Sequence, residues 1–259
     1  NMLHYSIVKH DSSDKWVTFI HGAGGSSSIW YKQIRSFSAE FNVLLIDLRG
    51  HGKSKLPTYA NLKRYTFDSI GDDVLEVLNH LNLKSSHFVG ISLGTIVIRE
   101  IAERFPSRVD SMIMGGAVMK LNFRGQILMR LGVLLKSVIP YLLLYRFFAF
   151  IIMPRKSHRE SRNLFVNEAK KLYQKEFKRW FTLVAEVNGL LSLFRFKDSG
   201  IPTLYIMGEE DHMFLPSITK LVKDHKMSEL FVIPSCGHVV NVEQPKIFNK
   251  KSVGWLLNN

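Results

Sequence analysis

Short apolar runs alternate with longer stretches of helical period through the first half of the chain. Val17–Ile20 and Val43–Ile46 are short and almost entirely apolar, as strands covered on both faces should be, with a helix expected between them. From Phe67 to Leu81, apolar residues recur at three- and four-residue spacings, which predicts another helix. Two more strands are expected at His87–Ile91 and Val109–Met114, with a helix between them at Leu93–Arg104. This alternation predicts an α/β fold, with a mostly parallel central sheet flanked by helices.

The alternation stops between residues 119 and 200 and resumes at Pro202–Gly208 and Leu230–Ile233. No strand pattern occurs in the intervening stretch, whereas helical spacings do. We therefore expect a core domain built from residues 1–118 and 201–259, with a helical cap, or lid, inserted at 119–200.

The expected cap is both basic and apolar. Residues 120–200 hold 16 Lys plus Arg and 5 Asp plus Glu, so they carry a net charge of +11 out of +13 for the chain. Within them, Ile127–Met153 has 21 apolar residues in 27. Arg130, Lys136 and Pro140 interrupt this run, so two short amphipathic helices fit better than a span of the roughly 20 residues that a bilayer requires. Such an apolar load must cover a pocket, a partner subunit or a lipid surface.

A single cysteine, Cys236, excludes an internal disulfide and a zinc site built on several thiolates. With 46% hydrophobic and 22% charged residues the chain is not of a disordered class. The amino end shows no charged leader followed by an apolar run. We therefore expect no secretory signal, and a cytoplasmic protein.

The sharpest local signal is the pentapeptide Gly90-Ile91-Ser92-Leu93-Gly94, which matches G-x-S-x-G where a predicted strand meets a predicted helix. Such a tight turn holds Ser92 in a strained backbone conformation, and the glycines remove side chains that would collide there. The hydroxyl is then exposed above the sheet, and the start of the helix points N–H groups at any oxyanion beside it. The alternative is a serine that caps a helix between two chance glycines.

A serine nucleophile requires a base and an orienting acid, and candidates for both follow predicted strands. Glu209, Glu210 and Asp211 come directly after one strand, and His238 comes after the last. The order Ser92, Asp211, His238 is the chain order of such triads on an open α/β sheet. We choose Asp211 because the residues after it would start the next helix and fix where the loop turns. Glu209 and Glu210 stay open as alternatives.

A glycine-rich loop, His21–Gly25, ends the first predicted strand. Its backbone N–H groups can face inward, and the N–H of Ala23 with that of Leu93 would make a two-donor oxyanion hole. Phosphate binding is the alternative for such a loop. However, the G-x-G-x-x-G spacing is absent and no G-K-[ST] follows, which argues against a nucleotide site.

Together with Trp30 and Asp47–Ser54, these motifs resemble the α/β-hydrolase superfamily, specifically its serine esterase and lipase-like branch. The resemblance covers nearly the whole chain outside the expected cap. It implies the α/β-hydrolase fold, with the cap inserted between the sixth and seventh strands of the family's sheet. It also implies that Asp47 and Arg49 shape a turn beside the site and take no part in catalysis.

The resemblance assigns roles to five residues. Ser92 would be the nucleophile, Asp211 the acid after the family's seventh strand, and His238 the base after the eighth. The oxyanion donors would be the backbone N–H groups of Ala23 and Leu93. The resemblance assigns no substrate-binding residue, because caps differ between family members more than the sheet does.

We therefore expect a serine hydrolase, carboxylesterase or lipase-like, that cleaves a carboxylic ester with a hydrophobic acyl or alcohol part through an acyl-enzyme. The same triad can serve a lactonase, a thioesterase or a C–C bond hydrolase. A non-catalytic ligand-binding regulator on this fold is a further alternative. We expect no metal and no organic cofactor.

The expected partner is a small hydrophobic ester. We expect no nucleic acid, because no recognised binding module is present. The basic face of the cap is either a weak peripheral contact with anionic membrane or simply a solvated surface that aids solubility. The sequence leaves the oligomeric state open.

Overall fold

The computed structural model describes all residues except 1, 56–64, 121–122, 136–137 and 186. Within the described residues, seven strands form one sheet in the order β1-β3-β2-β4-β5-β6-β7. Only β1 runs antiparallel to its neighbour, β3; the other pairs are parallel. The strands are β1 Tyr5–Val8, β2 Trp16–Ile20, β3 Asn42–Ile46, β4 Ser86–Ile91, β5 Val109–Gly115, β6 Thr203–Gly208 and β7 Ser228–Ile233.

The predicted fold and six of these strands are confirmed. The edge strand β1 was not predicted, and the expected helix between β2 and β3 is a short 3-10 turn, Ser27–Trp30, followed by α1, Ile34–Ser38. The family resemblance placed Asp211 after a seventh strand and His238 after an eighth. In the described residues only β1 precedes β2, so each of these strands is numbered one lower here. Asp211 therefore follows the sixth strand and His238 the seventh.

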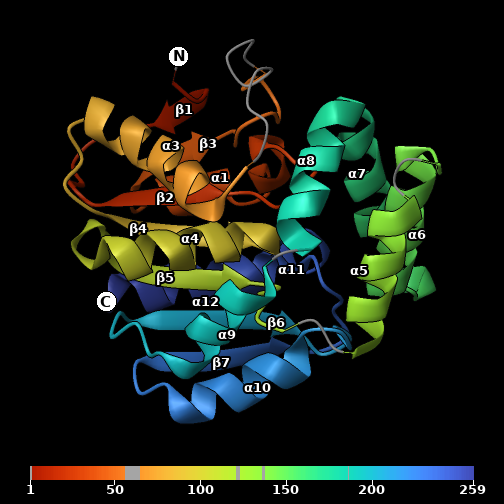
Figure 1. The fold of residues 1–259 in the computed structure, drawn as a ribbon. Helices are drawn as coiled ribbons and strands as arrows, with labels where there is room; N and C mark the ends of the chain where they lie inside the picture. The colour runs from red at the N-terminus through yellow and green to blue at the C-terminus, as the bar shows by residue number, and fades with distance from the viewer. Residues whose placement is uncertain (1, 56–64, 121–122, 136–137, 186) are drawn as a thin grey trace.

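Helices cover both faces of the sheet (Figure 1). One face packs against α3, α4, α9 (Asn188–Phe196) and α10, and the other against α1 and α12, so the core is two apolar layers separated by the sheet. The predicted helix after Phe67 begins with a capping box between Thr66 and Ser69. The helices are α3 Phe67–His80, α4 Leu93–Arg104, α10 Leu215–Asp224, α11 Val240–Glu243 and α12 Pro245–Leu257.

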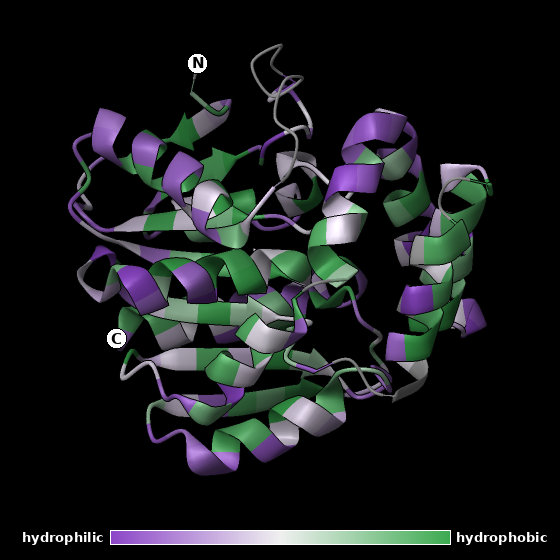
Figure 2. Cartoon of the chain, viewed as in Figure 1, coloured by the Kyte–Doolittle hydropathy of each residue, from purple (hydrophilic) through white to green (hydrophobic). Residues whose placement is uncertain are grey.

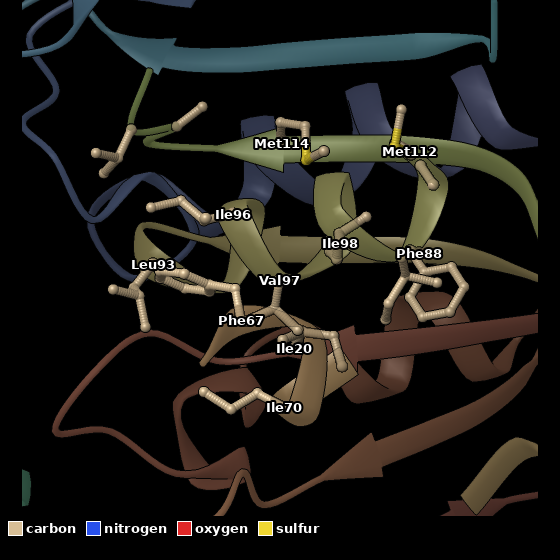
Figure 3. Close-up of a cluster of buried hydrophobic side chains, with 14 of the residues drawn as sticks. Ile20, Phe67, Ile70, Phe88, Leu93, Ile96, Val97, Ile98, Met112 and Met114 are labelled. Atoms are coloured by element: carbon tan, nitrogen blue, oxygen red, sulfur yellow. The ribbon is translucent and has the colours of Figure 1, made fainter. Parts of the chain in front are cut away.

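The central helix α4 is buried along most of its length. Figure 3 shows Ile96 and Ile98 of this helix among side chains from β4, β5 and α3, including Phe88 and Met114. Both isoleucines are fully buried. This packing fixes the start of α4, where Ser92 lies, against the carboxyl ends of the strands.

Between β5 and β6 the described chain is helical, and we call helices α5 to α9 the helical insertion. As expected, Ile127–Met153 forms two short helices, α5 and α6, and Pro140 caps the second. None of the helices in the described residues is long and apolar enough to cross a membrane. The insertion comprises α5 Phe123–Leu135, α6 Tyr141–Ile152, α7 Arg159–Lys170, α8 Gln174–Ala185 and α9 Asn188–Phe196.

Candidate active site

Ser92 lies at the junction of β4 and α4. Its φ of 51° is in the left-handed region, as the strained turn requires, and its side chain makes no capping hydrogen bond to α4. A Cβ on Gly90 would lie 2.6 Å from Ile98 Cδ1, and one on Gly94 would collide with the Ile20 carbonyl. The two glycines are therefore packing requirements of the turn.

Of the three carboxylates after β6, Asp211 is the one that faces His238. Glu209 accepts a backbone N–H from the loop after β7. Glu210 forms an ion pair with Arg155 and a hydrogen bond with His158, both from the segment between α6 and α7. The Asp211 side chain is fully buried. The structure thus separates the three acids that sequence spacing left open.

Ser92, Asp211 and His238 form one hydrogen-bonded row. His238 Nδ1 lies 2.7 Å from Asp211 Oδ2, and His238 Nε2 lies 2.9 Å from Ser92 Oγ. Asp211 Oδ1 accepts the Phe214 N–H at 3.2 Å, and the Phe214 ring lies 5.1 Å from the imidazole. When Nδ1–H donates to the carboxylate, Nε2 presents its lone pair to the serine hydroxyl. The arrangement can accept a proton from Ser92 and hold the resulting imidazolium beside a carboxylate.

The glycine-rich loop His21–Gly25 packs against this serine. A Cβ on Gly22 would lie 3.3 Å from Ser92 Cβ and 3.8 Å from Leu93 N. Leu93 is the first residue of α4, so its N–H has no intrahelical acceptor. Neither its N–H nor that of Ala23 donates to another group in the described part of the chain. Both residues line the same cavity as Ser92, which is the arrangement an oxyanion hole requires.

Two buried histidines that sequence reasoning missed hold this loop in place. His51 Nε2 accepts the Gly24 N–H at 2.8 Å, and its Nδ1 lies 3.0 Å from the Arg49 carbonyl. His21 accepts a backbone N–H through Nε2 and donates to a loop carbonyl through Nδ1. Burial lowers the pKa of both imidazoles, that of His51 to about 3, so each stays neutral and can accept. His21 lies in the glycine-rich loop His21–Gly25 and His51 in the segment Asp47–Ser54. Their place in these two motifs was the sequence signal that could have indicated this role.

Asp47 and Arg49 shape the neighbouring turn. Asp47 accepts the backbone N–H groups of Ser27 and Lys53 at 2.8 and 2.9 Å, which lowers the pKa of its carboxyl despite burial. Arg49 forms an ion pair with Asp73 at 2.7 Å. These contacts are those of residues that fix a turn.

The helical insertion reaches the glycine-rich loop through Tyr145 of α6. Its hydroxyl donates to the Ala23 carbonyl at 2.8 Å, and its ring stacks on Phe165 at 4.3 Å. Burial raises the pKa of Tyr145 well above its usual value, so the phenol stays protonated and remains a donor. One residue therefore ties the insertion to the backbone that carries the Ala23 N–H.

A second contact joins α8 to the core. Trp180 Nε1 donates to the Arg49 carbonyl at 3.1 Å. Beside it, the buried Glu176 accepts from the Tyr65 hydroxyl and pairs with Arg179 at 2.7 Å. Burial and the neighbouring carboxylate raise the pKa of Tyr65, which keeps that hydroxyl a donor. Two helices of the insertion are thus anchored close to the site.

A cavity of about 160 Å³ lies over Ser92, between the sheet and the helical insertion. No charged side chain lines it among the described residues. The polar side chains of the lining include Tyr145 and Trp180, which direct their polar atoms to backbone carbonyls. Apolar walls come from both parts of the chain and include Ile96, Val118, Phe148, Phe177, Phe181 and Phe214.

Cys236 lies near this site but is poorly suited to react. Its side chain is fully buried, and burial raises the pKa of the thiol, so the thiolate is scarce at neutral pH. Within the residues described, no cluster of three or more His, Cys, Asp or Glu could hold a metal ion.

Known proteins of similar sequence include two hydrolases. The chain is 27% identical over 240 residues to 3-oxoadipate enol-lactonase 2 of Acinetobacter baylyi, covering 89% of this chain and 84% of the relative. It is 27% identical over 267 residues to the putative carbamate hydrolase RutD of Agrobacterium fabrum, covering 98% of each.

Solved structures share the whole fold. A thermophilic esterase from Thermogutta terrifontis superposes with a TM-score of 0.81 at 20% identity, covering 99% of this chain and 93% of that one. The model of the α/β hydrolase fold family matches residues 15–245, which include Ser92, Asp211 and His238. The chain therefore belongs to the α/β hydrolase family.

Proposed function

We propose that the protein is a serine hydrolase that cleaves a carboxylic ester with a neutral, hydrophobic acyl or alcohol part. The observation that carries this proposal is the row from Ser92 Oγ through His238 to Asp211, with distances of 2.9 and 2.7 Å. The relatives named as an enol-lactonase and a carbamate hydrolase support hydrolytic chemistry at an acyl carbon.

In the first half-reaction, Ser92 Oγ attacks the ester carbonyl while His238 Nε2 takes its proton. Asp211 holds the imidazole in the correct tautomer and stabilises its charged form. The N–H groups of Ala23 and Leu93 bind the oxyanion. The tetrahedral intermediate then collapses, and His238 gives the proton to the departing alcohol, which leaves an acyl-serine.

The second half-reaction repeats these roles with water. His238 removes a proton from the water as the oxygen attacks the acyl-serine carbonyl. Collapse of the new tetrahedral intermediate breaks the bond to Ser92 Oγ, and the histidine returns the proton to that oxygen. The products are an alcohol and a carboxylic acid, and the enzyme is regenerated.

The cavity supports the substrate class. An apolar lining without charged side chains among the described residues favours a neutral hydrophobic group and disfavours one that carries a free carboxylate. A lactone is the second candidate, because it is a cyclic ester and a relative is named as an enol-lactonase.

The test uses p-nitrophenyl esters of increasing acyl length and neutral lactones with alkyl side chains. We expect turnover on the esters, and a loss in kcat of about 10⁵-fold or more in Ser92→Ala. A fluorophosphonate probe should label Ser92, identified by peptide mapping. Equal rates for wild type and Ser92→Ala, with no labelling, would end the proposal. Faster turnover of every lactone would select the second candidate.

A further inference from the structure

Helices α5 and α6 are apolar on two faces, and only one of these faces is buried. The inner face, with residues such as Leu128 and Phe148, lines the cavity. The opposite face is exposed to solvent, and Figure 2 shows both helices as mostly apolar at the right-hand edge of the molecule. We call this the outer face, and its apolar residues include Ile127, Leu131, Leu134, Leu143, Phe147 and Phe150.

The outer face follows helical spacing, so it is a continuous stripe on each helix. On α5 the exposed leucines recur at three- and four-residue steps, and on α6 Leu143, Phe147 and Phe150 do the same. Leu134 is 74% exposed and Phe150 is 58% exposed. Gly132 of α5 packs against Phe148 of α6, so the two helices are in contact. Apolar patches of this kind on a protein surface mark interaction sites.

The charge carried by α5, α6 and the residues that flank them in sequence is of one sign. No Asp or Glu occurs between residues 111 and 159, whereas eight Lys or Arg do. Arg130 and Arg146 lie within the two stripes, are exposed, and have no ion-pair partner among the described residues. The occupant of this face must therefore accept apolar side chains and supply negative charge.

A second copy of the chain fits this requirement poorly. In a two-fold contact the same patch meets itself, so Arg130 and Arg146 would face like charges, and neither α5 nor α6 contains an acid to offset them. Nucleic acid supplies the negative charge but offers no apolar layer for exposed leucines. An anionic bilayer supplies both, because its acyl chains lie just beneath its phosphates.

We propose that the outer face docks on the surface of an anionic lipid bilayer. Leu134, Phe147 and Phe150 enter the boundary between headgroups and acyl chains, while Arg130 and Arg146 contact lipid phosphates. The helices lie on the membrane and do not cross it. This surface is separate from Ser92, so the proposal stands or falls independently of the proposed hydrolysis.

The test is sedimentation with vesicles of phosphatidylcholine mixed with phosphatidylglycerol, compared with vesicles of phosphatidylcholine alone. We expect binding to the anionic vesicles that weakens as salt is raised. The double variant Leu134→Ser/Phe147→Ser should bind about 100-fold more weakly, since two large apolar side chains no longer leave water. Arg130→Gln/Arg146→Gln should lose about 25-fold at low salt, near fivefold for each charge.

Matched controls separate this surface from bulk properties. Phe196→Ser removes an aromatic ring that is 86% exposed outside the outer face, and Lys220→Gln/Lys223→Gln on α10 removes the same charge as the arginine variant. Both should bind like wild type. Circular dichroism and hydrolysis of a short soluble ester should show all four variants folded, with unchanged turnover.

Three outcomes would overturn the proposal. One is no binding to anionic vesicles at low salt. Another is equal losses in the outer-face variants and their controls. The third is a wild-type dimer, seen by sedimentation velocity, that Leu134→Ser/Phe147→Ser converts to monomer without affecting vesicle binding. Duplex DNA that binds as tightly as the vesicles, and is unaffected by the serine variant, would instead indicate a site for polyanions.

Discussion

The sheet core and the helical insertion bury their apolar residues in different ways. Strands β3, β4 and β6 are buried along their whole length, with apolar helices on both sides. In the insertion, α5 and α6 bury one apolar face over the cavity and expose the other. The core holds Ser92 and His238 among buried elements, whereas the insertion covers the cavity over Ser92 and exposes a second apolar surface.

Charge follows the same division. Residues 120–200 carry a net charge of +11 and the rest of the chain +2. The acids Glu160, Glu168 and Glu176 of the insertion are each paired with a cation. Two cations of residues 120–200, Arg155 and Lys197, pair with acids of the core. Under the two proposals, catalysis belongs to the core and membrane docking to the insertion. The predictions below substitute residues of the core first and residues of the insertion second.

The largest expected effect concerns the core. Asp211→Asn should lower kcat about 10⁴-fold, because the amide no longer holds the imidazole in the tautomer that accepts from serine. Glu210→Gln, one residue away, should change kcat less than tenfold, because that carboxylate contacts the insertion. Hydrolysis of a p-nitrophenyl ester measures both. Losses of similar size would show that His238 does not distinguish the two acids.

A smaller effect is expected on stability. The pKa of folded His51 is about 3 against an ordinary value of 6.5, so as pH falls the unfolded chain takes up this proton first. The free energy of unfolding is therefore unaffected by the titration of this histidine above pH 6.5. Below that pH it declines, by about 2 kcal/mol at pH 5. Urea denaturation at several pH values should show this decline, and His51→Gln should flatten it. Parallel curves for the two proteins would contradict the burial argument.

The contact between the two parts predicts a change in turnover. Tyr145→Phe removes the donor to the Ala23 carbonyl, and we expect kcat to fall about tenfold with little change in KM. Tyr141→Phe is the matched control, because its hydroxyl donates to the Leu172 carbonyl within the insertion and not to the glycine-rich loop. If both variants behave alike, the insertion does not position the glycine-rich loop.

The smallest effect concerns substrate choice. Phe181→Leu should enlarge the cavity and raise kcat/KM for long acyl chains relative to short ones by about fivefold. Leu193→Ala, on an exposed position of α9, should leave this ratio unchanged. A competition between two p-nitrophenyl esters of different length measures it. An unaltered ratio in Phe181→Leu would place the acyl chain elsewhere.

Local sequence was sufficient for the parts of the site that depend on local backbone geometry. The turn at Ser92 needs glycines two residues away on each side, and that requirement is visible as a spacing. Strands buried on both faces are continuous apolar runs, so the positions of Asp211 and His238 after β6 and β7 were predictable too. The choice among three acids rested on where the next helix begins.

Other features depend on packing between distant segments. Strand β1, Tyr5–Val8, is short and half-buried at the sheet edge, and its pattern has no clear alternation. Tyr145 and Phe181 are ordinary apolar positions of helices until the fold brings them over Ser92. The exposed stripes on α5 and α6 look like core positions in sequence, because periodicity does not tell which of two apolar faces will find a partner.

Two contacts connect the loop after β6 to the helical insertion. Arg155 and His158, just before α7, both pair with Glu210 at 2.6 Å, and Glu210 is bonded through the chain to Asp211. Any force that lifts the insertion at this point must either break these pairs or pull on the peptide that carries the neighbouring acid. A displacement of the insertion at this point is therefore transmitted to Asp211 through a single peptide bond.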